Sequence, residues 1–222
     1  MSATTKILRR DFIRAVRSGG SWSYGLVFMA IFLALSAIAF DGEMATLRKM
    51  GVPLIWMAVT FASLMSVDHA FSDDLRDGTT GQLWLADVSY MTQAVAGILS
   101  YAFIYLLPLI LTAPLWSLLF DLPSNTVKGL IIALICACPG LAAFTGLAGA
   151  LTGARGKGGF LAIFISAPLL VPLLIFGVAA TRSFAELGWA AVELRALIGL
   201  SLLALALSIP SSAAALAVNT DR

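Results

Sequence analysis

Residues 50–67, MGVPLIWMAVTFASLMSV, form an uncharged stretch of eighteen residues, and its length decides the fold class. As an α-helix with a rise of about 1.5 Å per residue, this stretch is about 27 Å long, close to the roughly 30 Å hydrocarbon core of a bilayer. Five longer uncharged stretches occupy residues 18–40, 88–120, 129–154, 158–181 and 196–220. The sequence therefore predicts six membrane-spanning segments.

The composition supports the same conclusion. Of the 222 residues, 60% are hydrophobic and 12% are charged, against about 25% charged in soluble domains. In lipid, every backbone N–H and C=O must pair internally, which favours helices, and the stretches lack the alternating polar positions of a barrel strand. We predict an all-α polytopic protein with one domain over residues 1–222, and spans at about 21–40, 51–70, 92–120, 128–153, 159–180 and 195–218.

The basic residues that flank these spans predict the orientation of the chain. If the N-terminus is cytoplasmic, nine of them flank the inner ends: Lys6, Arg9, Arg10, Arg14, Arg17, Arg76, Arg155, Lys157 and Arg222. Five flank the outer ends: Arg48, Lys49, Lys128, Arg182 and Arg195. This asymmetry favours both termini inside.

The N-terminal segment has the pattern of a helix that lies in the membrane interface. Over residues 4–19, Leu8, Phe12 and Val16 share one helical face, and a second face carries basic residues, namely Lys6, Arg10, Arg14 and Arg17. Two alternatives are a basic flank without a fixed helix, and a signal peptide whose Ala-x-Ala cleavage pattern would lie at residues 37–39. The apolar run at residues 18–40 is longer than the apolar region of a typical signal peptide.

The residues needed for catalysis or for metal binding are scarce. His69 is the single histidine, which argues against a Ser-His-Asp triad or a histidine metal cluster in one chain. Cys136 and Cys138 are expected to fill space in the fourth span. A phosphate loop ending at residues 156–157 would need glycine in place of Leu151 and Ser or Thr in place of Gly158. We therefore predict no catalytic residues, no metal site and no cofactor bound by this chain alone.

Residues 71–85, FSDDLRDGTTGQLWL, form the one inter-span segment with a distinctive pattern. Acidic residues precede a glycine break, and an apolar piece follows it, so charge and apolar surface are combined. Such a surface can dock into a groove on a partner; the alternative is a solvated turn in which Asp73 or Asp74 caps a helix. The candidate partner-binding residues are Phe71, Asp73, Asp74, Arg76, Asp77, Gly78, Gln82, Leu83 and Trp84.

This segment, read as F-x-D-D-L-R-D-G-x-x-x-Q-L-x-L, resembles the signature of the haem exporter protein B family, the membrane subunits of the ABC transporter of cytochrome c maturation. A second similarity lies in the fifth span, where two glycines at 158 and 159 lead into PLLVPLLIF at residues 168–176. The resemblance covers essentially the whole chain. It departs at Asp87 and Val88, where a proline-containing turn is expected, and at residues 51–53, where the usual order is proline then glycine.

The resemblance implies a bacterial inner-membrane permease of the ABC-2 type, without enzymatic activity of its own. A cytoplasmic ATPase subunit, a haem-handling membrane protein and a second copy of the chain are the implied partners, with haem as the transported substrate and no nucleic acid. The N-terminal segment would be the elbow helix and residues 71–85 the coupling element. ATP-driven closure would press on Phe71, Leu83 and Trp84, while acids at 73, 74 and 77 would meet basic groups of the ATPase.

Two features of the later spans predict how the helices bend and pack. Pro168 and Pro172 each remove a backbone hydrogen bond and would kink the fifth span. Gly149 and Gly153 have the spacing of a small-residue packing face in the fourth. Three alternative functions remain: an ABC-2 permease for another hydrophobic substrate, a membrane scaffold that anchors haem-handling partners, and a secondary transporter or channel. The last is poorly supported, because no span carries a charge near its middle.

Overall fold

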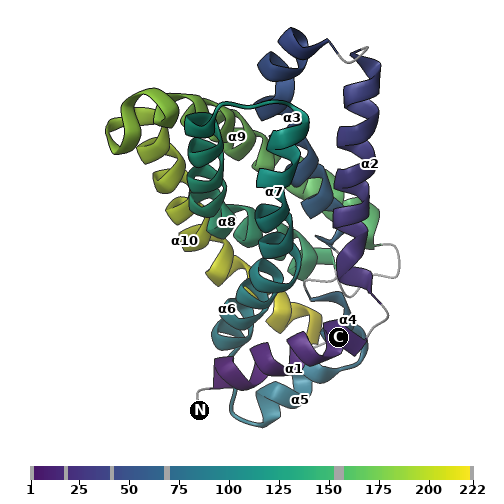
Figure 1. Ribbon diagram of the computed structural model, residues 1–222. Helices are drawn as coiled ribbons and strands as arrows, with labels where there is room; N and C mark the ends of the chain where they lie inside the picture. The colour runs from purple at the N-terminus through teal and green to yellow at the C-terminus, as the bar shows by residue number, and fades with distance from the viewer. Residues whose placement is uncertain (1–2, 18–19, 41–42, 68–70, 153–157, 221–222) are drawn as a thin grey trace.

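The protein is a bundle of long helices, shown in Figure 1 as a computed structural model that describes residues 3–17, 20–40, 43–67, 71–152 and 158–220. Within these ranges every regular element is helical. Five segments of 22 to 30 residues are long and apolar enough to cross a bilayer. The all-α polytopic fold predicted from the sequence is confirmed.

The membrane-spanning region consists of the following helices: α2 (Tyr24–Ala39), α3 (Met44–Met65), α6 (Tyr90–Tyr101), α7 (Leu107–Leu119), α8 (Ser124–Thr152), α9 (Gly158–Leu187) and α10 (Val192–Thr220). Helices α6 and α7 form one continuous span through a π-helical turn at Ala102–Leu106. With α6 and α7 counted as one span, α2 is the shortest span and is about 24 Å long. A 3-10 turn at Ser21–Ser23 precedes it.

Several helices continue past the charged residues that flank the uncharged stretches. Helix α3 begins at Met44 and therefore contains Arg48 and Lys49, whereas the predicted span begins at residue 51. Helix α9 likewise contains Arg182 and ends at Leu187. Long basic side chains can extend their charge to water from a helical backbone. Charged residues thus mark the approach to the membrane surface and do not mark the ends of the helices.

The π-helical turn in the third span follows from the position of Pro108. Proline has no N–H, so the carbonyl of Ile104 cannot receive the usual bond from the residue four positions later. The chain instead widens by one residue, and the N–H of Leu107 donates to the carbonyl of Ala102, five positions earlier. The span is continuous, and its middle lacks regular α-helical pairing.

Helix α8 lies at the centre of the bundle, against both α9 and α10. Small residues allow the close approach, as is common in membrane helices. Gly129 lies against the carbonyl of Thr181, and a Cβ at Gly140 would be 2.9 Å from Oγ of Ser201. Gly149 is buried on the predicted small-residue face, while Gly153 is outside the described residues.

Trp56 connects α3 to α9. Its side chain is fully buried, its indole ring lies on Gly177, and its Nε1 donates to Oγ1 of Thr181 at 3.0 Å. Thr181 Oγ1 in turn donates to the carbonyl of Gly177 at 2.9 Å. Because a side chain at position 177 would collide with the indole, this contact requires glycine.

Pro168 and Pro172 both lie inside α9, which is helical from Gly158 to Leu187. Neither proline therefore ends the helix. The predicted kink at these positions stays a prediction.

Three short helices lie at one end of the bundle, together with the C-terminal end of α10 (Figure 1). Helix α1 (Ala3–Arg17) runs across this end, close to the predicted range of 4–19, and packs on α6. Helices α4 (Ser72–Arg76) and α5 (Thr79–Leu85) connect α3 to α6 beside it. Segments from the start, the middle and the end of the sequence therefore meet at one place.

We expect Gly177→Ala to lower the thermal stability of the protein, because the added methyl group must displace the Trp56 indole. Overpacking of a tight core costs about 1–3 kcal/mol. Gly199→Ala is the matched control, since the space beside Gly199 is open. The check is a thermal unfolding series on both purified variants in detergent; equal unfolding temperatures would contradict the packing described here.

Candidate partner-binding site

Residues 71–85 fold as two short helices separated by a glycine. Gly78 has a φ of +71°, in the left-handed region that favours glycine. Asp73 and Asp74 lie in the first turn of α4, where negative charge stabilises a helix. The N-cap residue of α4 is Phe71, and no side chain caps the helix. Neither aspartate therefore has the capping role that the solvated-turn alternative gave them.

Phe71 points into the bundle, so its assignment to the partner-facing surface is wrong. Only 6% of the residue is exposed. Its ring lies directly against Gly97 of α6, and a Cβ built at Gly146 of α8 would be 3.6 Å from it. The two glycines form a socket for the phenyl ring, and Phe71 anchors α4 between two spanning helices.

Asp74 also faces inward, and it binds the N-terminal helix. Arg10 donates from Nη2 to Oδ2 of Asp74 at 2.5 Å, and Arg14 donates from Nη1 to Oδ1 at 3.0 Å. A third contact joins Arg14 and Asp77 at 3.8 Å. The prediction that these acids all meet basic groups of a partner is therefore wrong for Asp74, whose charge is neutralised within the chain.

The electrostatics of Arg10 fit this arrangement. Burial of the guanidinium acts to lower the pKa of Arg10, but the carboxylates of Asp74 and Asp11 outweigh burial and raise the pKa above its ordinary value. The side chains of Arg10, Arg14 and Asp74 are 30%, 41% and 22% exposed. These pairs are thus better shielded from water than ordinary surface ion pairs.

Asp11 and Ser100 complete the attachment of α1, and the sequence analysis missed both. Arg10 donates to Oδ1 of Asp11 at 2.9 Å and 2.7 Å, while Ser100 Oγ on α6 donates to Oδ2 at 2.7 Å. Helix α1 is therefore bound to α4 and to α6 through adjacent residues. The sequence did contain a signal for this role, because Asp11 is the single acidic residue of an otherwise basic helix.

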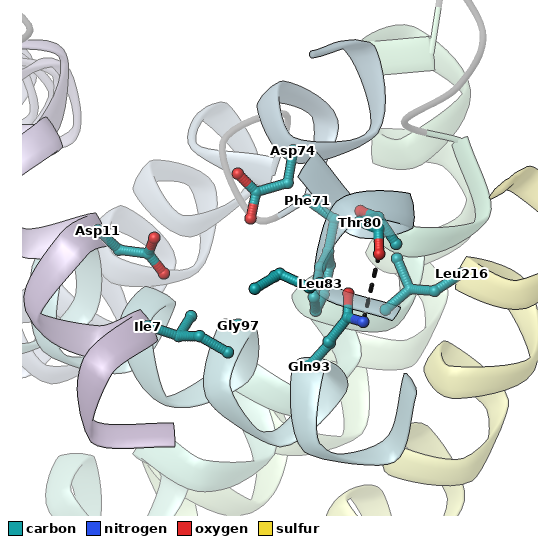
Figure 2. Close-up of a pocket in the computed structure, with 9 residues that line it drawn as sticks. All are labelled: Ile7, Asp11, Phe71, Asp74, Thr80, Leu83, Gln93, Gly97 and Leu216. Carbon is teal, nitrogen blue, oxygen red and sulfur yellow. Dashed lines mark hydrogen bonds between the residues drawn. The ribbon is translucent and has the colours of Figure 1, made fainter. Parts of the chain in front are cut away.

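A small pocket lies where α1, α4, α5, α6 and α10 meet, as Figure 2 shows. Its volume of about 20 Å³ is enough for one water molecule, so it is a gap within a packed junction and not a cavity for a substrate. Gln93, also missed from the sequence, borders it and donates to the carbonyls of Thr80 at 3.3 Å and Val88 at 2.9 Å. These bonds attach α5 to α6.

Trp84 and Leu85 point away from the junction. They are 50% and 84% exposed, and Trp84 stacks on Tyr90 with ring centroids 4.6 Å apart. Leu83, by contrast, is half-buried and borders the pocket. We call the exposed set the docking surface; it comprises Asp73, Arg76, Asp77, Gly78, Gln82, Trp84 and Leu85.

The described residues contain no group of three or more His, Cys, Asp or Glu side chains that could hold a metal ion. Cys136 and Cys138 are free thiols, both half-buried in α8. His69 lies outside the described residues.

A family model, that of the CcmB protein, matches residues 2–219. The chain belongs to the CcmB protein family. Among its relatives, Heme exporter protein B of Rhodobacter capsulatus is 32% identical over 213 residues, covering 96% of this chain and 98% of the relative. Heme exporter protein B of Paracoccus denitrificans has the same identity and coverage. The protein of that name in Escherichia coli K12 is 29% identical over 176 residues, covering 79% of this chain and 80% of the relative.

We expect Asp74→Asn to loosen α1, because Arg10 and Arg14 lose their shared carboxylate. The three side chains are half-shielded from water, so the loss of stabilising free energy should lie between the values for surface and for buried ion pairs, at about 1–2 kcal/mol. Hydrogen exchange of residues 3–17 in the purified protein should then be about tenfold less protected. Asp73→Asn is the control, since Asp73 is exposed and has no ion pair among the described residues. Equal protection in the two variants would show that the ion pairs do not hold the helix.

Proposed function

We propose that this CcmB-family protein is the membrane subunit of an ABC transporter that exports or handles haem in c-type cytochrome biogenesis. Its partner is a separate cytoplasmic ATPase subunit, which binds at the docking surface. The proposal rests on one observation. Trp84 and Leu85 are exposed side by side at one end of a bundle whose long helices are apolar enough to cross a membrane. Haem as the cargo is supported by the name of the relatives, Heme exporter protein B.

The contacts behind the docking surface support a mechanical role. Helix α4 enters the socket of Gly97 and Gly146 through Phe71, and α5 is attached to α6 through Gln93. A displacement of the docking surface by the ATPase is thus passed to α6 and α8 by van der Waals contact and hydrogen bonds. Beyond Gly97, the force reaches the π-helical turn at Ala102–Leu106, where irregular pairing permits bending.

The proposal places the docking surface and both termini in the cytoplasm of a bacterium, with the bundle in the inner membrane. The nine-to-five asymmetry of basic residues supports this orientation, as does the common location of α1, α4, α5 and the end of α10 (Figure 1). A haem-handling membrane protein and a second copy of the chain are further proposed partners. They would contact the lipid-facing sides of the helices, because the docking surface is assigned to the ATPase.

The docking surface is tested by co-purification with a co-expressed cytoplasmic ABC ATPase. We expect the double variant Trp84→Ala/Leu85→Ala to lose at least 2 kcal/mol of binding, as central aromatic anchors do, and to retain less than a tenth of the ATPase. The matched control is Trp189→Ala/Leu118→Ala at the opposite end of the bundle. Leu118 is 79% exposed, close to the 84% of Leu85. Equal recovery of the ATPase with both double variants would overturn the assignment.

The force path is tested separately by Phe71→Ala. We expect this variant to keep the ATPase, since Trp84 and Leu85 on α5 remain attached to α6 through Gln93 and Tyr90. It should lower haem attachment to c-type cytochrome several-fold, because α4 loses its contact with Gly97 and Gly146. The measurement is haem-stained cytochrome normalised to the amount of the variant in the membrane. Phe176→Ala on the exposed side of α9 is the control. A proportional fall in ATPase recovery and cytochrome would show that Phe71 supports only docking, and the proposed path would be wrong.

A further inference from the structure

Helix α1 has three distinct faces. The first carries Ile7, Asp11 and Ala15 and packs on the bundle. The second exposes Phe12 and Val16, with the exposed Arg9 at its edge. Both apolar side chains point away from the protein, which is the arrangement of a helix that lies in the membrane interface.

The third face is basic and contains a shallow open groove. It is lined by three arginines and one isoleucine at helical spacing, namely Arg10, Ile13, Arg14 and Arg17. Ile13 is 38% exposed and lines the groove beside the arginines. The groove therefore combines several N–H donors with a small apolar floor, on a helix whose neighbouring face is lipid-directed.

The charges around this groove are not balanced. Arg10 and Arg14 are paired with Asp11 and Asp74, but Arg17 has no acidic partner among the described residues and is exposed. Arg14 is only loosely paired with Asp77, at 3.8 Å. Positive charge is thus left at the C-terminal end of the groove.

The aromatic residues that follow α1 fix the depth of the groove in the membrane. Trp22 and Tyr24 are both exposed at the start of α2, and such residues are enriched at the level of lipid headgroups. Arg17 precedes Trp22 by only five positions. This closeness in sequence favours a position of the groove near the depth of the lipid phosphates.

We propose that the groove of Arg10, Ile13, Arg14 and Arg17 binds the headgroup of an anionic phospholipid of the inner leaflet. The phosphate accepts N–H bonds from the guanidinium of Arg17 and the free donors of Arg14, since the planar guanidinium fits a phosphate oxygen pair. The glycerol and upper acyl carbons rest on Ile13, and the chains continue beside Phe12 and Val16. A zwitterionic lipid fits less well, because its own cation faces the arginines. The choice of the inner leaflet rests on the orientation proposed above, whereas the binding of the headgroup by these residues does not depend on the proposed function.

The test is native mass spectrometry of the purified full-length protein, titrated in detergent with dioleoyl phosphatidylglycerol or dioleoyl phosphatidylcholine. We expect the first phosphatidylglycerol to bind at least fivefold more tightly than the first phosphatidylcholine. Arg17→Gln should weaken the phosphatidylglycerol complex about fivefold, the effect of roughly 1 kcal/mol for one basic residue at an anionic surface.

Arg9→Gln is the matched control, because Arg9 is an exposed arginine of the same helix that does not line the groove. Its effect on the first phosphatidylglycerol should stay below twofold. Absence of any preference for phosphatidylglycerol in the unchanged protein would overturn the proposal and leave an acidic protein segment as the occupant of the groove. Equal weakening by both substitutions would also overturn it, since the attraction would then be diffuse.

Discussion

The carboxylate of Asp74 is the constraint on which the junction of α1, α4, α5, α6 and α10 depends. It accepts hydrogen bonds from Arg10 and Arg14, and Arg10 reaches Asp11, which accepts from Ser100. Removing one member of a half-shielded ion pair leaves the other charge without its partner, so the members of this network stabilise one another. The network joins the N-terminal helix, the segment between α3 and α6, and α6 itself. Without it, α1 would be held to the bundle mainly by Ile7 and Ala15.

A second, apolar attachment lies behind this polar one. Phe71 fills the space left by Gly97 and Gly146, and Gln93 binds two carbonyls that flank α5. The polar network resists separation of α1 from α4, whereas the phenyl ring resists sliding of α4 along α6. Helices α4 and α5 are too short to be stable alone. Their position is therefore fixed by the longer helices.

The parts of this arrangement that depend on local sequence could be predicted, whereas the parts that depend on contacts between distant residues could not. The spans are visible because residues 50–67 and the other uncharged stretches match the thickness of a bilayer. The glycine break at Gly78 and the amphipathic nature of α1 are also local properties. The inward direction of Phe71 and Asp74 is not local, because a five-residue helix has no periodicity that distinguishes its inner side from its outer side. The partner of Asp74 lies 64 residues away in the sequence.

The boundaries of α3 show a related limit. Arg48 and Lys49 directly precede the uncharged stretch of residues 50–67, yet α3 contains both of them. Hydropathy reports where the membrane ends, while hydrogen bonding decides where the helix ends, and the two coincide only by chance.

The separation of exposed and buried residues within 71–85 has a consequence for energetics. Trp84 is already stacked on Tyr90, so its side chain is ordered before any partner arrives, and binding need not supply that ordering free energy. Phe71 and Gln93, which the proposal assigns to transmission, are buried and lie apart from the exposed side chains that it assigns to partner binding. The two proposed roles therefore fall on different side chains. Each can be altered by a substitution that leaves the other set in place.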